Sequence, residues 1–360
     1  MKHQPQRVNR MPRLARPKPR VAAGALAAGI VASLAALNAA PAFAQAAKAV
    51  ELRYATVAPA KTVWVNQAER VAKAAEEESG GNLKISVFHS GQLGSEVDAL
   101  QQVARGRIDM GAFSGPAAAL MVPEMQVLTA PFYFRDSKEG DCVIDSLTPA
   151  VRELWAAKGV QFLAWGHNGE SIGAAKRPIT SPADLKGLKV GMTGTRTLVN
   201  YFTALGANTT VAGATDFASA FQTGLIDWAS ITTVFYVAAG IGKVAPVMTR
   251  ANITEIPTLY LMNKATYDQL SPDQQQALSR AWARTPAAQM RKEVRDFEQV
   301  MRNAHEMGGG QIVQLTPEQR EAWRKTAAPL LPKWMEDIGP GGPKMAEQAD
   351  AARMACAKQG

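Results

Sequence analysis

The sequence predicts an α/β protein with a two-lobed, periplasmic-binding-protein-like fold and mostly parallel sheets. Two observations lead to this fold class. The chain has 360 residues, of which 47% are apolar, so it can form two domains with buried cores. From residue 50 to residue 231, strand-like and helix-like segments alternate, as they do in parallel sheets covered by helices. Such sheets bind ligands at the carboxyl ends of their strands.

Residues 1–44 predict a secretory signal peptide. They contain seven basic residues and no acidic one, then an uncharged run over 21–37 and small residues before Ala44. We expect cleavage after Ala44 and export to the periplasm; the alternative is an uncleaved membrane anchor. The net charge of the chain is +9, and removing the seven charges of the leader leaves +2. The basic excess therefore does not indicate a nucleic-acid partner.

Three strand–helix units open the mature part of the chain. Each strand is short, and the first two helices end at glycine, which favours a helix C-terminus. Gly80 and Gly81 follow the first helix and Gly106 follows the second. The expected elements are a strand over 50–57, a helix over 63–78, a strand over 84–88, a helix over 95–105, a strand over 108–113, a helix over 149–158 and a strand over 160–165.

The alternation continues to residue 231 and then gives way to helices. Ser181 caps a helical turn, and Gly206 and Gly224 end two later helices. Ser271-Pro272 and Thr285-Pro286 each place a cap residue before a proline, which predicts two successive helices with a break between them. The expected elements are strands over 188–192 and 226–231 and helices over 197–205, 215–223, 272–284, 286–306 and from 316 onward.

Cys142 and Cys356 are the only cysteines. In an oxidising compartment we expect them to pair and to fix the C-terminal segment; the alternative is two separate buried thiols. No spacing of cysteine, histidine or carboxylate residues matches a metal site, and no glycine-rich loop matches a phosphate site. The sequence therefore predicts neither a metal nor a cofactor.

One segment matches a catalytic motif. Residues 169–173 read Gly-Glu-Ser-Ile-Gly, the G-x-S-x-G pattern of a nucleophile elbow, with Ser171 as the nucleophile. The elbow requires a helix directly after the serine, and Pro178 follows too closely for one. The only histidine after it is His305. A serine hydrolase is therefore a minor alternative.

Four segments, in this order, resemble the substrate-binding proteins of tripartite ATP-independent periplasmic (TRAP) transporters, the DctP-like family. The resemblance spans residues 50 to about 305 and implies a receptor without catalytic activity. Such a receptor closes two lobes over one small solute and delivers it to a membrane permease. The segments are 90–96 with 104–110, 122–124 with 131–136, 177–179 with 182–190, and 221–227.

The resemblance also implies how the chain divides between the lobes. Lobe I is expected to contain 45–168 and 257–296, and lobe II 169–256 and 297–360. A long helix bridges the lobes in this family, and Thr285-Pro286 is expected to kink or split it here.

The sequence departs from the family where the solute would bind. The arginine that grips a solute carboxylate in most members corresponds to Gly191, and a second frequent arginine falls at or beside Glu170 or Ser171. The family's asparagine corresponds to Ile231 and its glycine to Trp228. Because glycine has no side chain to donate hydrogen bonds, the usual carboxylate clamp is missing at its usual place.

Arg196 is the remaining candidate for an anionic solute, because it begins a predicted helix five residues after Gly191. If Arg196 does not bind the solute, we expect a neutral solute or one whose amine faces Glu170 or Asp216. The other expected contacts are polar residues near strand ends and aromatic residues that would suit an apolar solute body, namely Asn168, Ser114, Thr193, Trp228 and Phe235.

The sequence thus predicts an exported, monomeric receptor of a TRAP transporter. Its expected solute is a small organic acid with an aromatic or otherwise apolar body, held by Arg196. An alternative with the same fold is a soluble sensor that signals through a membrane protein.

Overall fold

The computed structural model describes residues 49–358. The expected signal peptide lies outside this part of the chain. Within it, no helix combines the length and the apolar character that crossing a membrane requires.

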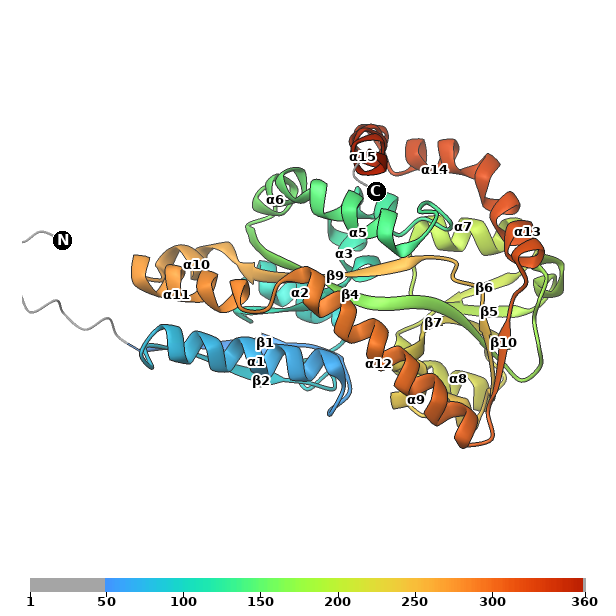
Figure 1. The fold of residues 1–360 in the computed structure, drawn as a ribbon, viewed down its shortest axis with the longest axis horizontal. Coiled ribbons are helices and arrows are strands. Elements are labelled where there is room, and N and C mark those ends of the chain that lie inside the picture. Colours follow the sequence, from blue (N-terminus) through green and yellow to red (C-terminus); the bar gives the residue numbers. More distant parts are fainter. Residues whose placement is uncertain (1–48, 359–360) are drawn as a thin grey trace, which may run out of the picture. The chain divides into compact units, whose positions relative to one another are not determined.

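Two sheets share one long strand, β4 (Val160–Ala175), which runs through the centre of the molecule in Figure 1. We call them sheet A and sheet B. Sheet A has the order β2-β1-β3-β9-β4, with β1 parallel to β2 and β3, and β9 antiparallel to β3 and β4. Its other strands are β1 (Val50–Ala55), β2 (Leu83–Phe88), β3 (Met110–Ser114) and β9 (Glu255–Asn263).

Sheet B uses the second half of β4. There β4 pairs antiparallel with β7 and β8, whereas β5 is parallel to β6 and β7, and β10 is parallel to β8. Its other strands are β5 (Lys189–Met192), β6 (Asn208–Val211), β7 (Trp228–Thr232), β8 (Val247–Arg250) and β10 (Gln311–Gln314). The predicted fold class is confirmed: the outer strands pair in parallel, and β4 and β9 connect the two sheets.

The strand expected over 160–165 continues to residue 175. Its last five residues are all buried, because β7 and β8 flank them within sheet B. Glycine at positions 166, 169 and 173 weakens the strand pattern in the sequence. Gly166 and Gly173 are required by close neighbours, since a Cβ would overlap the rings of Tyr260 and Trp228.

Helices cover both sheets. α1 (Val63–Glu78) packs on β2 and on α11 (Pro272–Ala283), whereas α12 (Ala287–Met307) runs across β4 and also contacts α1, α9 and β10 (Figure 1). The break expected at Thr285-Pro286 is confirmed. The other helices are α2 (Glu96–Ala104), α3 (Gly115–Met121), α4 (Met125–Leu128), α5 (Ser137–Ser146), α6 (Thr148–Ala156), α7 (Arg196–Ala204), α8 (Phe217–Gln222), α9 (Thr233–Ala238), α10 (Lys264–Gln269), α13 (Pro317–Ala327), α14 (Leu331–Asp337) and α15 (Gly341–Ala357).

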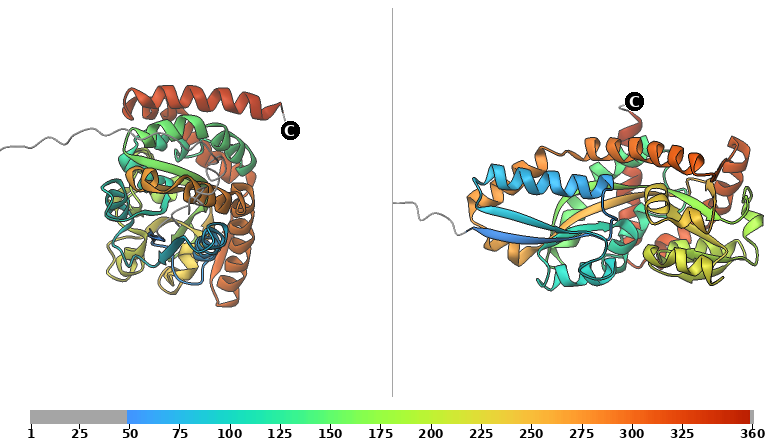
Figure 2. Two further views of the ribbon diagram at one scale, coloured as in Figure 1. Left: turned by 90° about the vertical axis from the view of Figure 1, so that its left-hand side faces the viewer. Right: turned by 90° about the horizontal axis from the view of Figure 1, so that it is seen from below.

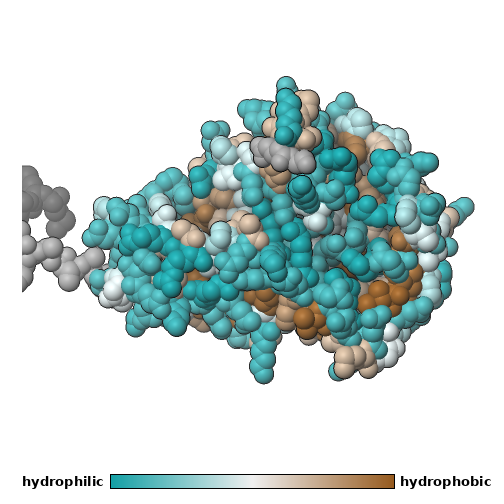
Figure 3. Space-filling model, viewed as in Figure 1, coloured by the Kyte–Doolittle hydropathy of each residue, from teal (hydrophilic) through white to brown (hydrophobic). Residues whose placement is uncertain are grey.

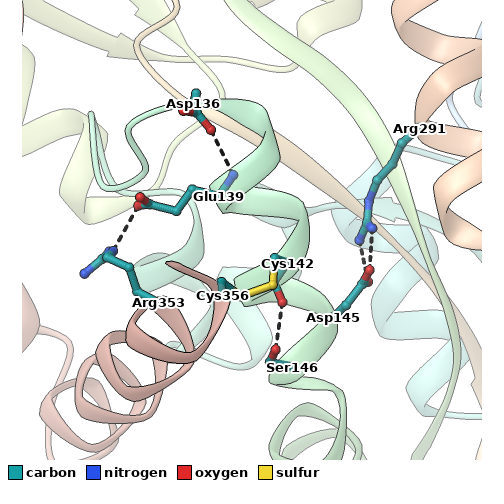
Figure 4. Close-up of a disulfide and its surroundings, with 8 residues drawn as sticks. All are labelled: Asp136, Glu139, Cys142, Asp145, Ser146, Arg291, Arg353 and Cys356. Carbon is teal, nitrogen blue, oxygen red and sulfur yellow. Dashed lines mark hydrogen bonds and ion pairs between the residues drawn. A yellow bond between two sulfur atoms is a disulfide. The ribbon is translucent and has the colours of Figure 1, made fainter. Parts of the chain in front are cut away.

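Helix α15 is fastened to α5 by a disulfide between Cys356 and Cys142, whose Cα atoms are 6.1 Å apart (Figure 4). Arg353 supports this attachment by donating to the buried carboxylate of Glu139 at 2.9 Å. Figure 2 shows α15 lying on the outside of the helices beneath it. The C-terminal segment is therefore held against α5, which belongs to the part of the chain expected in lobe I. The lobe boundaries at residues 168 and 257 remain a prediction.

Hydrophilic residues cover most of the face seen in Figure 3, and hydrophobic residues show mainly at its lower right, toward the end that holds sheet B. The apolar side chains otherwise form buried clusters around the two sheets.

Candidate functional site

A cavity of about 70 Å³ lies between sheet A and sheet B. Thr56 follows β1 and Ser114 ends β3 on one side, while Thr193 follows β5 and Thr232 ends β7 on the other. The carboxyl ends of parallel strands from both sheets therefore converge on one space, which is where α/β folds bind ligands. One water molecule needs roughly 10–15 Å³ of such space, so the cavity has room for a small solute or several waters.

The lining combines hydroxyl groups with apolar and aromatic surface. This composition suits a small organic molecule with a few polar groups. The polar members are Thr56, Glu96, Ser114, Asn168, Thr193, Ser230, Thr232, Thr254 and Thr258, and the larger apolar members are Val57, Trp64, Phe113, Met192, Leu198, Ile231, Phe235 and Ile256.

Glu96 is the only charged residue among the described residues that line the cavity. Its carboxylate accepts a hydrogen bond from the Ser114 backbone N–H at 2.6 Å and another from the Ser114 hydroxyl at 3.0 Å. Burial raises the pKa of Glu96 above its ordinary value, and the two bonds from Ser114 oppose this rise because they favour the carboxylate. Glu96 also begins helix α2, whose N-terminus favours a negative charge.

Five of the residues expected to bind the solute lie in the cavity wall. They come from β3, β4, β7, α9 and the residue after β5, so both sheets contribute. These residues are Ser114, Asn168, Thr193, Ile231 and Phe235.

Arg196 is not part of this wall, contrary to expectation. It begins α7 as predicted, but its side chain is exposed and donates to the Asp337 carbonyl at 3.0 Å. Arg196, the first residue of α7, is exposed, whereas Leu198, the third residue of the same helix, lines the cavity. In this structure the Arg196 guanidinium therefore lies outside the cavity wall.

Trp228 was expected in the cavity and is instead core, with 1% of its surface exposed. Its ring lies 5.1 Å from that of Phe202. Gly191 is buried as well, and a Cβ there would meet Ile226 at 2.9 Å. Asp216 is exposed outside the cavity wall. None of these three positions brings a side chain to the solute space.

Ser171 does not form a nucleophile elbow. It lies within β4, where it pairs with Thr232 of β7, so the strand does not turn into a helix there. Its hydroxyl is fully buried and lies 2.7 Å from the Ser230 hydroxyl. Because the serine is neither exposed nor beside a histidine, this geometry does not support nucleophilic catalysis.

Glu170 belongs to a partly buried group of ionisable residues where α12 crosses β4. Its carboxylate accepts from Arg250 at 3.1 Å, and its backbone N–H donates to Glu298 at 3.1 Å. Burial and the charge of Glu170 raise the pKa of Glu298 to about 8. Burial and the charge of Glu170 also raise the pKa of Glu255 to about 7. An oxygen of the Glu255 carboxyl group (Oε2) lies 3.3 Å from Nε2 of His167. Burial lowers the pKa of His167 well below its ordinary value.

Reasoning from the sequence identified five of the wall residues and missed the others, of which Glu96 and Trp64 matter most for the chemistry of the cavity. Glu96 ends the segment 90–96 that carried part of the family resemblance, so a signal for it was present. Trp64 gave no signal, because it stands at the second position of an ordinary amphipathic helix. Across residues 49–358 no group of three or more metal-ligating side chains is found that could hold a metal ion.

Comparison with known proteins places the chain in a family. Residues 54–337 match the model of bacterial extracellular solute-binding protein, family 7. A solute-binding protein of Verminephrobacter eiseniae is 31% identical over 210 residues, which cover 57% of this chain and 62% of that protein. The match thus spans less than two-thirds of the length of that relative. An ectoine/5-hydroxyectoine-binding periplasmic protein of Ruegeria pomeroyi is 27% identical over 77% of this chain and 83% of its own length.

The fold has a close counterpart among solved structures. A TRAP periplasmic solute-binding protein from Roseobacter denitrificans, solved with bound β-D-glucuronate, superposes with a TM-score of 0.78 and is 25% identical. The alignment covers 84% of this chain and 99% of that one. The family consists of solute-binding proteins and not of enzymes. With most of its described residues matched by the family model, this chain belongs to family 7 of the bacterial extracellular solute-binding proteins.

Proposed function

We propose that the protein is an exported receptor that binds one small organic solute in the cavity between sheets A and B and delivers it to the membrane permease of a TRAP-type transporter. The observation that carries this proposal is the convergence of strand ends from both sheets on one cavity. A solute there contacts both sheets at once, so its binding free energy favours the arrangement in which they are close together.

The class of solute that we propose is broader than the organic acids that one relative suggests. β-D-glucuronate in the Roseobacter structure makes carboxylic acids the first compounds to test. The expected acid held by Arg196 is not supported, because that guanidinium is bonded to Asp337 away from the cavity. We therefore propose a small organic solute.

A thermal-shift screen of organic acids, amines and neutral metabolites tests the proposal. A ligand that binds only the folded state stabilises it by about 2.7 kcal/mol at a hundred times its Kd. Titration calorimetry of the best compound should then show that Asn168→Ala, in the cavity wall, weakens binding, whereas Asp216→Ala, outside it, does not. Equal affinity in both variants, or chemical conversion of the bound compound, would contradict the proposal.

Delivery to a permease distinguishes a transport receptor from the sensor alternative. Uptake of the identified solute should be measured in cells that express the TRAP permease of the source organism, with and without this protein. A transport receptor is required for uptake, whereas a sensor leaves uptake unchanged.

A further inference from the structure

We infer that the cavity selects a solute with a positively charged nitrogen and rejects carboxylates; this inference rests on the proposed receptor function. The inference rests on which ionisable residues line the cavity, because they determine whether a cation or an anion is attracted. Glu96 is an acidic residue whose two hydrogen bonds from Ser114 favour the carboxylate, and among the described residues of the wall no lysine, arginine or histidine stands beside it.

Glu96 is built to accept further hydrogen bonds. The Ser114 hydroxyl receives a bond from the Ala117 backbone N–H, so its own proton points to Glu96. The two bonds from Ser114 fix the carboxylate and use about half of its acceptor positions. The remaining positions are free to accept from a donor on the solute, and such a bond is strongest when the donor is charged.

Two arginines near wall residues of sheet B form their hydrogen bonds outside the cavity. Arg196 donates to the Asp337 carbonyl, and Arg250 binds both Glu170 and Gln314. A carboxylate in the cavity would therefore have only neutral donors as partners. It would also be repelled by Glu96 in a space where screening by water is weak.

The aromatic part of the wall favours the same sign. Trp64, Phe113 and Phe235 line the cavity. The indole N–H of Trp64 already donates to the His167 carbonyl at 2.9 Å, so it presents ring surface to the cavity and no donor for an anion. Aromatic rings attract cations and have no comparable attraction for carboxylates. Glu96 and these rings together form a site for an ammonium or amidinium group on a small organic body.

The charge of the cavity can be measured whatever the natural solute is. Both native cysteines are in the disulfide, so a cysteine introduced by Thr193→Cys in the cavity wall is the only reactive thiol. Its reaction rates with a cationic and an anionic methanethiosulfonate of similar size (the trimethylammonium-ethyl and sulfonatoethyl reagents) give a charge preference. Ser230→Cys supplies a second cavity position, and Val300→Cys on the exposed side of α12 is the control.

We expect the cationic reagent to be preferred at both cavity positions and Glu96→Gln to reduce that preference at least about fivefold, with no change at the control position. Unchanged preference in Glu96→Gln would overturn the inference. The receptor proposal can fail in its ligand screen without affecting this result, so the two failures are distinguishable.

Matched compounds then test the selectivity itself. Phenethylamine and 3-phenylpropionate differ mainly in charge, as do 6-amino-6-deoxy-D-glucose and D-glucuronate. In each pair we expect thermal stabilisation by the amine to exceed that by the acid, and the difference to disappear in Glu96→Gln. Greater stabilisation by either acid would overturn the inference.

Discussion

The carboxyl group of Glu298 on α12 accepts a hydrogen bond from the backbone N–H of Glu170 on β4. Glu298 is 2% exposed, and Gly169 beside this bond has a φ of +110°. A Cβ at residue 169 would overlap the Glu298 carboxyl group, so glycine is required there by both its conformation and its neighbour. The bond ties the helix that crosses both sheets to the strand that they share.

Glu298 should make the stability of the protein fall as pH rises. The folded state keeps its proton up to a pKa of about 8, whereas the unfolded chain releases it near 4.5. Burial of Glu298 therefore does not lower the free energy of unfolding below about pH 4.5, where both states hold the proton. The free energy of unfolding falls between about pH 4.5 and 8, and this loss is complete above pH 8. Between pH 5 and 8 we expect the free energy of unfolding of wild type, relative to Glu298→Gln, to fall by up to about 1.4 kcal/mol per pH unit.

Urea denaturation at several pH values measures this difference. His167 has a lowered pKa and so contributes stability that is lost as pH falls, but it is present in both proteins and cancels in the comparison. Glu306→Gln, on the exposed side of the same helix, is the control. A pH-independent difference between wild type and Glu298→Gln would show that residue 298 is ionised in the folded state.

Loss of the disulfide should destabilise the protein by about 2–5 kcal/mol, because the bond joins residues 214 positions apart and restricts the unfolded chain. The comparison is between wild type and the Cys142→Ser/Cys356→Ser variant in denaturant with and without reductant. Reductant should weaken wild type and leave the variant unchanged. If reductant changes neither, the bond does not form in solution.

Arg196→Ala should change the affinity for the solute less than twofold. The guanidinium is exposed and bonded to a backbone carbonyl of α14, whereas removing a buried charged partner costs about 2–4 kcal/mol. Calorimetric titration of the compound found in the screen gives the value. A loss of that larger size would return Arg196 to the binding site.

Solute binding should be reported by Trp64 and not by Trp228. Trp64 lines the cavity, while Trp228 packs against Phe202 in the core. We expect the solute-dependent change in tryptophan fluorescence to shrink in Trp64→Phe and to persist in Trp228→Phe. The reverse pattern would mean that the cavity is not where the solute binds.

Most helices whose ends are set by nearby cap residues, prolines or glycines could be predicted from the sequence. Helices with a cap residue before a proline, such as α11 at Ser271-Pro272, begin where expected. The second half of β4 was missed because its glycines are required by neighbours such as Tyr260 and Trp228, which only the fold brings there. Strand β9 was missed as well, although it joins β3 to β4 in sheet A.

The site was predicted less completely for the same reason. Ser114 and Thr193 could be placed at strand ends from the order of the elements alone. The direction of Arg196 depends on which side of α7 faces the cavity, and the sequence near residue 196 does not determine that. Trp228 is aromatic and near a strand end, but whether such a ring faces a core or a cavity is decided by packing against residues such as Phe202.

The shared strand β4 limits how the molecule can be divided. The strands of the two sheets interleave along the chain: β9 of sheet A lies between β8 and β10 of sheet B, and β4 belongs to both. No single cut yields two fragments that each contain a whole sheet. Split versions of this receptor would therefore have to recombine before either piece became ordered, and circular permutation would be a gentler way to relocate its ends.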